Sequence, residues 1–283
     1  MMVENRPLLA VVRHLVLLAG IAVVLLPVWL AFVASTMSGG DMLDGRLGLL
    51  PGDQFSANFR AVLVDGLRSA GVPPVGRMML NSLWMALSIS IGKIAISLLS
   101  AFAIVYFRFP LRKSMFWMIF MTLMLPVEVR IVPTFKVVAD FGLLDSTAGL
   151  ALPLIASATA TFLFRQFFIS VPPELAEAAR MDGASPMQFF KDVLLPLSRT
   201  NIAALFVILF IYGWNQYLWP FVATTDESHY TVVMGIQRMV AVPDSEPTWN
   251  IVMATAILGM LPPVLVVLAM QRLFVKGLVG GDK

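Results

Sequence analysis

The sequence predicts an all-α membrane protein with six transmembrane helices, on two observations. Of the 283 residues, 59% are hydrophobic and only 13% are charged, whereas soluble domains contain roughly 25% charged residues. The apolar residues also form six long runs, and each run has about the 20 residues that a helix needs to cross a bilayer. The expected spans are Leu15 to Ala34, Leu80 to Tyr106, Met115 to Phe135, Thr147 to Phe168, Ile202 to Val222 and Ile251 to Phe274.

The first span follows Arg6 and Arg13, as the apolar core of a secretory signal would. It is longer than such a core, however, and the bulky Phe32 stands where a cleavage site needs a small residue. We therefore expect a retained helix.

The distribution of charge predicts which side of the membrane each loop faces. With the amino terminus inside, twelve lysines and arginines fall in inner segments and seven in outer segments, and cytoplasmic segments collect basic residues. The turn from Arg108 to Lys113 is short and has no acidic residue, so it is the strongest indicator. Both termini and the loop from Arg165 to Thr200 are expected in the cytoplasm. The net charge of +3 follows from this topology and does not indicate nucleic-acid binding.

Three parts of the chain are expected from this pattern. An N-terminal helix and outer loop (1–76) precede a membrane core (77–272) and a cytoplasmic tail (273–283). The outer loop should contain a short amphipathic helix from Asn58 to Leu63. A second outer loop, from Ala223 to Trp249, is acidic and contains two prolines.

Residues needed for several kinds of catalysis are missing from the sequence. There is no cysteine, and the two histidines, His14 and His229, are too far apart for a histidine-rich metal site. The only Gly-Lys pair, Gly92-Lys93, is followed by isoleucine and lacks the first glycine of a phosphate-binding loop. Hydrolase motifs are also missing. We therefore expect no catalytic residue, metal or cofactor in this chain, and uphill transport would need energy from another subunit or an ion.

Between the fourth and fifth expected spans lies a polar segment with the spacing E-A-A-x3-G-x9-[IV]-x-L-P. Its residues are Glu177, Ala178, Ala179, Asp182, Gly183 and, at the end, Pro196.

This segment should form a helix of two to three turns. Pro172 and Pro173 can begin a helix, because the first turn needs no N–H partner. Glu174 and Glu177 are expected in the first turn, where carboxylates favour the positive end of the helix dipole. Gly183 suits the left-handed position past the helix end. The residues available to a neighbour's groove would be Leu175, Ala178, Ala179 and Met181. The alternative is a loop helix that packs only on its own membrane domain.

Charged side chains inside the expected spans are costly and are therefore functional candidates. Lys93 lies near the middle of the second span, at a cost of about 2.5–3.5 kcal/mol on insertion scales. It would either contact an anionic substrate or pair with a carboxylate or with helix-end carbonyl groups. Glu128 and Arg130 follow Pro126 late in the third span. They would line either a pathway or a subunit interface.

The fifth span contains a dense group of aromatic and amide residues, Tyr212 to Pro220. Trp214, Asn215 and Gln216 are candidates for substrate contact, or the two amides could hydrogen-bond a neighbouring helix. Trp219 is explained without a ligand, as part of an aromatic belt at the outer membrane interface. In the second span, small residues recur at four-residue spacing, as at Ala86 and Ser90, which allows close helix packing.

Taken together, these features resemble the permease subunits of carbohydrate-type ABC importers, the ATP-driven uptake systems of bacteria. The resemblance rests on the order of spans, on Arg77-x3-Asn81-Ser82 before the second span, and on the segment from Glu177 to Pro196. It covers nearly the whole chain, and Val193 in place of isoleucine is the single conservative departure in the segment.

The resemblance implies a type I ABC importer permease fold in the bacterial inner membrane. It also implies a second permease subunit in a heterodimer, a cytoplasmic ATPase dimer that binds ATP and Mg²⁺, and a periplasmic substrate-binding protein, but no nucleic acid. The helix near residues 173–183 would be the coupling helix that sits in a groove of the ATPase.

Several blocks are more particular and resemble the permeases of sn-glycerol-3-phosphate importers, among them Phe109 to Lys113 and Gly213 to Tyr217. They imply import of this substrate or of related glycerophosphodiesters, with Lys93, Arg130 and Lys136 as the first cations to test. A sugar or polyol importer of the same architecture is the alternative. More distant alternatives are an ion-coupled secondary transporter, which needs ion ligands at broken helices, and a non-transporting scaffold.

Overall fold

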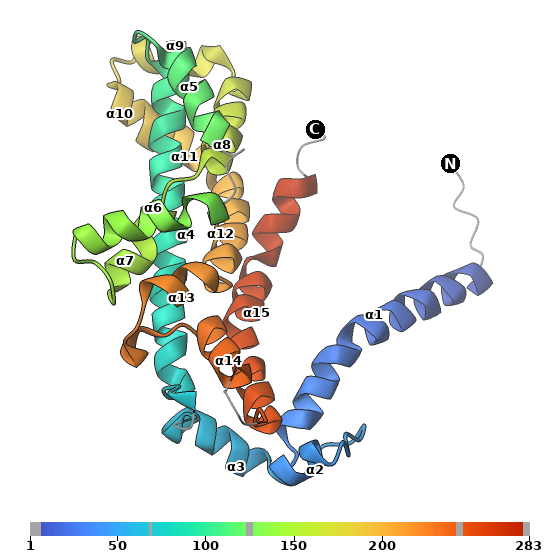
Figure 1. Ribbon diagram of the computed structural model, residues 1–283. Helices are drawn as coiled ribbons and strands as arrows, with labels where there is room; N and C mark the ends of the chain where they lie inside the picture. Colours follow the sequence, from blue (N-terminus) through green and yellow to red (C-terminus); the bar gives the residue numbers. More distant parts are fainter. Residues whose placement is uncertain (1–6, 68–69, 123–126, 242–245, 280–283) are drawn as a thin grey trace. The chain divides into compact units, whose positions relative to one another are not determined.

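The computed structural model describes residues 7–67, 70–122, 127–241 and 246–279, and these are helical apart from loops and one isolated bridge, Leu67 to Val72 (Figure 1). The chain forms two compact units. The first comprises Met1–Gly76 and Gly235–Met260, and the second comprises Arg77–Met234 and Leu261–Lys283.

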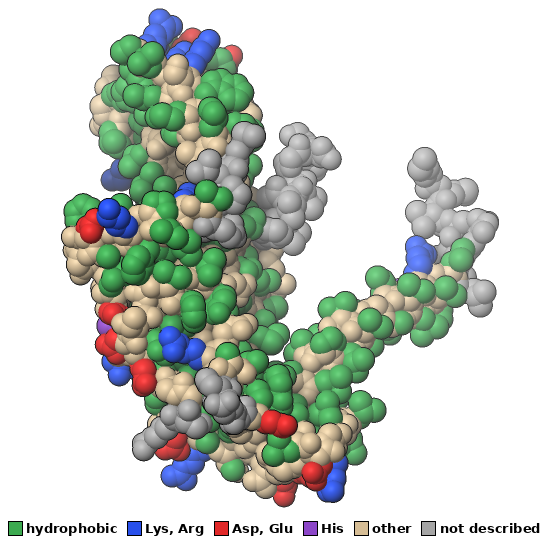
Figure 2. All heavy atoms as spheres, in the orientation of Figure 1, with side chains coloured by type: hydrophobic (Ala, Val, Ile, Leu, Met, Phe, Trp, Pro, Cys, Tyr) green, Lys and Arg blue, Asp and Glu red, His purple; other side chains and the backbone are tan. Residues whose placement is uncertain are grey.

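The first unit begins with the 29-residue helix α1 (Pro7–Ser35). Its apolar side chains are largely exposed, for example Leu15 at 60% and Val24 at 73%, and Figure 2 shows hydrophobic side chains along its length. In water such a surface would be unfavourable, whereas lipid solvates it. The expected first span is thus an apolar helix.

The buried amide of Asn58 connects several segments in the remainder of this unit. After α2 (Gly39–Leu43) come α3 (Phe55–Arg60) and the π-helix η1 (Ala61–Asp65), where the sequence predicts a helix at Asn58 to Leu63. Asn58 donates to the carbonyl oxygens of Ser35 and Met37, and its own oxygen accepts from Asn250 of α15 (Trp249–Val279). The expected loop helix therefore exists and begins three residues earlier.

The second unit is built along α4 (Val75–Tyr106), which is 32 residues long. The helices that follow are α5 (Arg112–Met121), α6 (Val127–Asp140), α7 (Thr147–Ala151), η4 (Leu152–Leu154), α8 (Ala158–Ser170), α9 (Pro173–Met181), α10 (Pro186–Phe189), η5 (Phe190–Leu194), α11 (Leu195–Leu197), α12 (Arg199–Trp214), α13 (Leu218–Ala223) and η6 (Glu227–His229). Helix α14 (Val232–Val240) begins in this unit, and its residues from Gly235 on belong to the first unit.

Two apolar clusters form the core of this unit, and α4 contributes to both. One cluster joins α4, α8, α10, η5 and α12, with Phe164 and Phe168 fully buried. The other joins α4, α6, α7, η4 and α13 around Trp219. Lys93 lies on α4 between Ile89 of the second cluster and Ile94 of the first. Its backbone position is therefore between the two clusters.

Close approach of α4 and α12 depends on a glycine. A Cβ atom added at Gly213 would lie 2.9 Å from Cα of Ala86, a distance that real Cβ atoms do not adopt. The small residues that the sequence shows at four-residue spacing on α4 therefore do permit tight helix packing at this point.

The long apolar helices account for part of the expected six spans. Three described helices are long and apolar enough to cross a membrane, within Val11–Ser35, Val75–Tyr106 and Trp249–Gln271, and two bent pairs would raise the number to five. The expected span from Met115 to Phe135 includes residues 123–126, which lie outside the described part. Six spans and cytoplasmic termini stay predictions.

Two expected spans are not single straight helices. Thr147–Leu154 and Ala158–Ser170 meet at an angle of 49°, after a 3-10 turn that contains Pro153. The expected fifth span to Val222 is wrong at its end, because α12 stops at Trp214. The Gln216 side chain donates to the carbonyl of Tyr212 in the last turn of this helix (3.1 Å). Further along, Pro220 has no N–H with which a continuous helix could bond the carbonyl of Gln216.

Candidate functional site

The polar segment after α8 folds as the sequence predicts. Helix α9 begins at Pro173, with Glu174 in its first turn, and ends at Met181 with Asp182 as the C-cap. Glu177 lies one residue beyond the first turn, so the prediction that places it there is wrong by one position. The N–H of Gly183 bonds the carbonyl of Arg180 (3.1 Å), and the N–H of Ala184 bonds that of Ala179 (2.9 Å).

These two bonds form a Schellman motif, which satisfies carbonyl groups left free at a helix end. Gly183 has φ +76°, a conformation that costs an L side chain about 1–2 kcal/mol. The expected role of this glycine is confirmed, and the helix end is defined by backbone bonds alone.

The two faces of α9 differ sharply in exposure. Met181 is 88% exposed and Leu175 39% exposed, and Glu177, Ala178 and Asp182 are exposed as well. Ala176 and Ala179 instead pack against the core cluster that joins α4, α8, α10, η5 and α12. Ala179, which the sequence analysis assigns to the free face, therefore faces its own bundle. The open face of α9 is formed by Leu175, Glu177, Ala178, Met181 and Asp182.

The seat of α9 is aromatic. The ring of Tyr106, at the end of α4, packs against Phe168 and Phe189 at centroid distances of 6.2 and 5.3 Å, and its hydroxyl donates to the carbonyl of Phe168 (3.3 Å). A cavity of about 280 Å³ lies between α9 and this end of α4. In Figure 2 basic side chains gather at the end of the unit where Figure 1 places α9 and α10. Helix α9 thus packs through Ala176 and Ala179 beside a group of edge-to-face rings and exposes its opposite face.

Pro196, the last residue of the motif, lies where the chain turns into α12. It is the second residue of α11, which follows the π-helix η5, and the segments before and after Ser198 are bent by 71°. The Ser198 hydroxyl donates to the carbonyl of Leu194 (2.6 Å), a bond that occupies a carbonyl near the break. A proline and a π-bulge are known causes of a sharp kink.

The buried cation Lys93 has an aromatic partner. It is 7% exposed, and its Nζ lies 4.1 Å from the ring centroid of Tyr212 on α12. The described partner of Lys93 is therefore a π face, which attracts ammonium groups, and a structural role through a carboxylate or helix-end carbonyls stays a prediction. Among the described residues Lys93 forms no ion pair.

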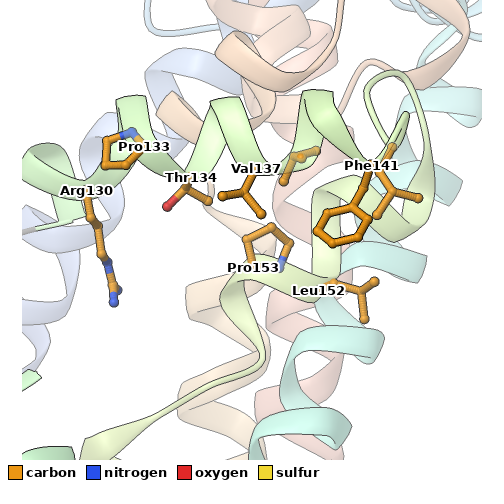
Figure 3. Close-up of a pocket in the computed structure, with 9 residues that line it drawn as sticks. Arg130, Pro133, Thr134, Val137, Phe141, Leu152 and Pro153 are labelled. Carbon is orange, nitrogen blue, oxygen red and sulfur yellow. The ribbon is translucent and has the colours of Figure 1, made fainter.

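A second cation, Arg130, acts on the same region. Its charge interacts repulsively with that of Lys93 and also acts on Tyr212. Arg130 is exposed at one end of a cavity of about 670 Å³ between α6 and the α7–η4 segment. Figure 3 shows Arg130 at one end of this row of residues and Phe141 at the other, with Pro133, Thr134 and Val137 between them. Two like charges without a described counterion favour an anion between or near them.

The other sequence candidates are distributed differently. Trp214 is buried, 2% exposed, and stacks on Phe210 at 5.9 Å. Asn215 is exposed at the end of α12, and Gln216 is half-buried. Lys136 is exposed on α6. Glu128 belongs to α6, but its side chain lies outside the described part.

The aromatic-belt interpretation of Trp219 is wrong. This side chain is 3% exposed, and its indole N–H donates to the carbonyl of Gly149 (3.1 Å). A belt residue keeps its polar edge at the water interface, whereas Trp219 satisfies that edge inside the bundle.

Two residues at the start of the second span hold the second outer loop. The Asn81 amide donates to the carbonyls of Ser228 (2.8 Å) and Tyr230 (3.0 Å). The neighbouring Ser82 hydroxyl accepts from the N–H of Val232 (2.9 Å). The Asn-Ser pair thus anchors the loop at the start of α14, a helix that the sequence analysis does not predict.

A carboxylate braces the same loop from another element. Asp145 accepts hydrogen bonds from the N–H of Thr225 (2.6 Å), the N–H of Asp226 (2.9 Å) and the Thr225 hydroxyl (2.8 Å). These bonds, above all that from Asp226, lower the pKa of the Asp145 carboxyl. Asp145 has φ +52°, a conformation that aspartate tolerates. The sequence analysis missed this brace, because its partners lie 80 residues away.

Comparison with known proteins agrees with this architecture. The model of the family described as "Binding-protein-dependent transport system inner membrane component" matches residues 93–280. A solved structure of a bacterial ABC transporter involved in the import of the acidic polysaccharide alginate contains a chain that is 22% identical, with a TM-score of 0.80, over 96% of this chain and 98% of that one. The two chains share a fold.

Curated relatives are much more similar in sequence. The sn-glycerol-3-phosphate transport system permease protein UgpE of Agrobacterium fabrum is 58% identical over 282 residues, 100% of each chain. The proteins of the same description from Salmonella typhimurium and Brucella melitensis are 57% and 55% identical, again over 100% of each chain. These relatives match from end to end, and the family model matches most of the chain. This chain therefore belongs to the family of inner membrane components of binding-protein-dependent transport systems.

Proposed function

We propose that this chain is the permease subunit of an ATP-driven importer of sn-glycerol-3-phosphate or related glycerophosphodiesters. The observation that supports this most strongly is the identity of 55–58% along the full length to permeases named for that substrate. With a second permease subunit the chain would form the translocation pathway, and a periplasmic binding protein would deliver the substrate.

The coupling step is proposed for the open face of α9. That face presents two carboxylates and several apolar side chains on a short helix whose opposite face packs on the bundle core. A groove in a cytoplasmic ATPase dimer would hold it, and closure of the dimer on ATP would move α9 with the elements packed on it. Such a change needs a rigid element that has two positions. ATP and Mg²⁺ would be bound by that partner.

Single cysteines test this assignment cleanly, because the chain has none. In the assembled complex, Ala178→Cys should cross-link to the ATPase with a short thiol-reactive reagent. Ala179→Cys, one residue away on the half-buried face that packs on the bundle, is the matched control and should react more slowly. Labelling of Ala178→Cys from the periplasmic side, or contact with no nucleotide-binding subunit, would contradict the proposal.

Lys93 and Arg130 are proposed to contact the phosphate of the substrate. The supporting geometry is a pair of neighbouring cations that form no ion pair with described residues, one of them buried against Tyr212. A neutral sugar would gain nothing from these charges, so a glycerophosphate importer explains them better than the sugar or polyol alternative.

The test compares Lys93→Met with Lys93→Arg, which keeps the charge. In vesicles that contain the whole transporter, Lys93→Met should raise the half-saturating concentration of sn-glycerol-3-phosphate about tenfold, equivalent to about 1.4 kcal/mol, and Lys93→Arg should raise it less. Arg130→Met should act in the same direction. If both neutral variants leave the uptake kinetics unchanged, the anion site belongs to the partner subunit. If a neutral sugar is transported instead, the substrate assignment fails.

A further inference from the structure

A second basic cavity lies near the end of the unit that carries α9. It has a volume of about 480 Å³ and is lined by residues of α4, α5 and α8. Three of these residues are cations, Arg112 and Lys113 of α5 and Arg165 of α8, and none is acidic. The rest of the lining is mainly aromatic and aliphatic, including Phe116, Trp117 and Ile169. We refer to it as the α5–α8 pocket.

The cations of the α5–α8 pocket are not neutralised by the protein. None of the three forms an ion pair with the described residues. The Arg165 guanidinium lies 4.2 Å from the ring centroid of Phe116, and its buried Nε finds no hydrogen-bond partner among the described residues. Arg112 uses one Nη1 hydrogen to bond the carbonyl of Phe107 (3.1 Å). Most of the donors of this cluster are therefore left for another molecule.

The pocket is at the depth expected of lipid headgroups. Arg112 and Lys113 are the first two residues of α5 and the last two of the basic turn expected in the cytoplasm. Arg165 lies in the second half of α8, shortly before the loop to α9. Trp117 is 60% exposed and Ile169 52% exposed. Tryptophan and basic residues are typical of the membrane–water interface, and exposed apolar side chains beside them suit acyl chains.

We propose that the α5–α8 pocket binds the headgroup of an anionic phospholipid from the inner leaflet. The lipid phosphate would contact Lys113 and the guanidinium of Arg165, and its acyl chains would lie along the exposed apolar side chains of α5 and α8. Basic pockets between transmembrane helices on the cytoplasmic side bind acidic lipid headgroups. The proposal depends on the membrane location of the chain and not on which solute it imports.

Native mass spectrometry of the complete transporter tests this. The complex is incubated with mixed micelles of phosphatidylglycerol or phosphatidylcholine, and retained lipid is counted. The wild-type complex should retain one phosphatidylglycerol molecule per copy of this permease, and phosphatidylcholine should not take its place. Lys113→Gln and Arg165→Gln should each lower retention at least fivefold. Lys191→Gln, which removes an exposed positive charge from η5 outside the pocket, is the matched control and should retain the lipid.

Several outcomes would overturn the proposal. Equal retention by Lys113→Gln, whose exposed side chain makes misfolding an inadequate explanation, would remove the site. Displacement of the lipid by millimolar inorganic phosphate would identify a soluble-anion site instead. A cross-link from Trp117→Cys to the second permease subunit would show that a protein surface fills the pocket. None of these results alters the tests of α9 and Lys93, so the two proposals can fail separately.

Discussion

The end of the second unit that is expected to face the cytoplasm and the opposite, expected outer end are held by different forces. At the expected inner end, α9 packs on edge-to-face rings through small side chains, and backbone bonds alone close its last turn. At the outer end, the loop from Thr225 to Val232 is tied by the side chains of Asn81, Ser82 and Asp145.

This difference has a physical consequence. Apolar packing is non-directional, so an element that rests on it can shift as a body while keeping most of its contacts. Hydrogen bonds from side chains to backbone are directional and weaken steeply with misalignment. The inner end is thus suited to movement as a rigid rod, and the outer end to a loop of one defined shape.

The largest effect is expected from breaking the end of α9. Gly183→Val forces a β-branched residue into a left-handed conformation at φ +76°, so the last turn should fray. Uptake should fall about tenfold or more while membrane insertion stays normal. Gly183→Asn, which tolerates this conformation, should keep most of the activity. Uptake by the valine variant at the wild-type rate would show that the Schellman motif does not serve coupling.

An intermediate effect is expected at the outer end from Asn81→Ala. The variant leaves the carbonyls of Ser228 and Tyr230 without their shared donor, at a cost of about 1–3 kcal/mol for buried groups. The melting temperature of the purified protein should fall, and proteolysis of the 225–232 loop should accelerate. Gln166→Ala, at an exposed amide on α8, should leave both unchanged. Unaltered loop proteolysis in Asn81→Ala would argue against the anchor.

The smallest effect is a pH dependence at Asp145. Hydrogen bonds lower the pKa of this carboxyl in the folded protein, so its contribution is fully present above the ordinary aspartate pKa of about 3.9. It is lost as the pH falls through the lowered folded value. Loop protection from hydrogen exchange should therefore be constant from pH 8 to 5 and decline below about pH 4.

Asp145→Asn sharpens this test, because asparagine fits the same backbone conformation and keeps one acceptor oxygen. The variant should show weaker loop protection at neutral pH and little further loss in acid. An unchanged acid decline in the variant would assign it to other carboxyls, such as Asp226, whose pKa is also lowered, mainly by the N–H of Ser228.

The sequence predicts the helices well where local signals are strong. The limits of α9 follow from Pro173 and Gly183, and the apolar α1, α4 and α15 follow from their length. The end of α12 at Trp214 is not predicted, because the apolar run continues past this residue. The Gln216 side chain bonds the carbonyl of Tyr212 near the helix end, a contact that the sequence does not signal. Helix α14 is missed because it lies in a stretch that composition marks as an acidic loop.

The candidate residues divide in the same way. The helical period predicts that one face of α9 is exposed and the other packed. Which residues lie on each face depends on how the helix packs against the bundle, and this packing turns Ala179 inward. The partner of Lys93 is Tyr212, which lies more than a hundred positions later, and nothing local signals this pair. Trp219 looks interfacial by type but bonds Gly149 in the interior. Long-range pairing decides these cases.

The contact between Gly213 and Ala86 limits where a solute can travel. Since even a methyl group at Gly213 would lie only 2.9 Å from Cα of Ala86, the two helices are in close contact there. No room is left at that level for a solute between the two helices. In this conformation a translocation pathway would have to run along another side of the helix pair, and the contact between Gly213 and Ala86 would form part of its wall.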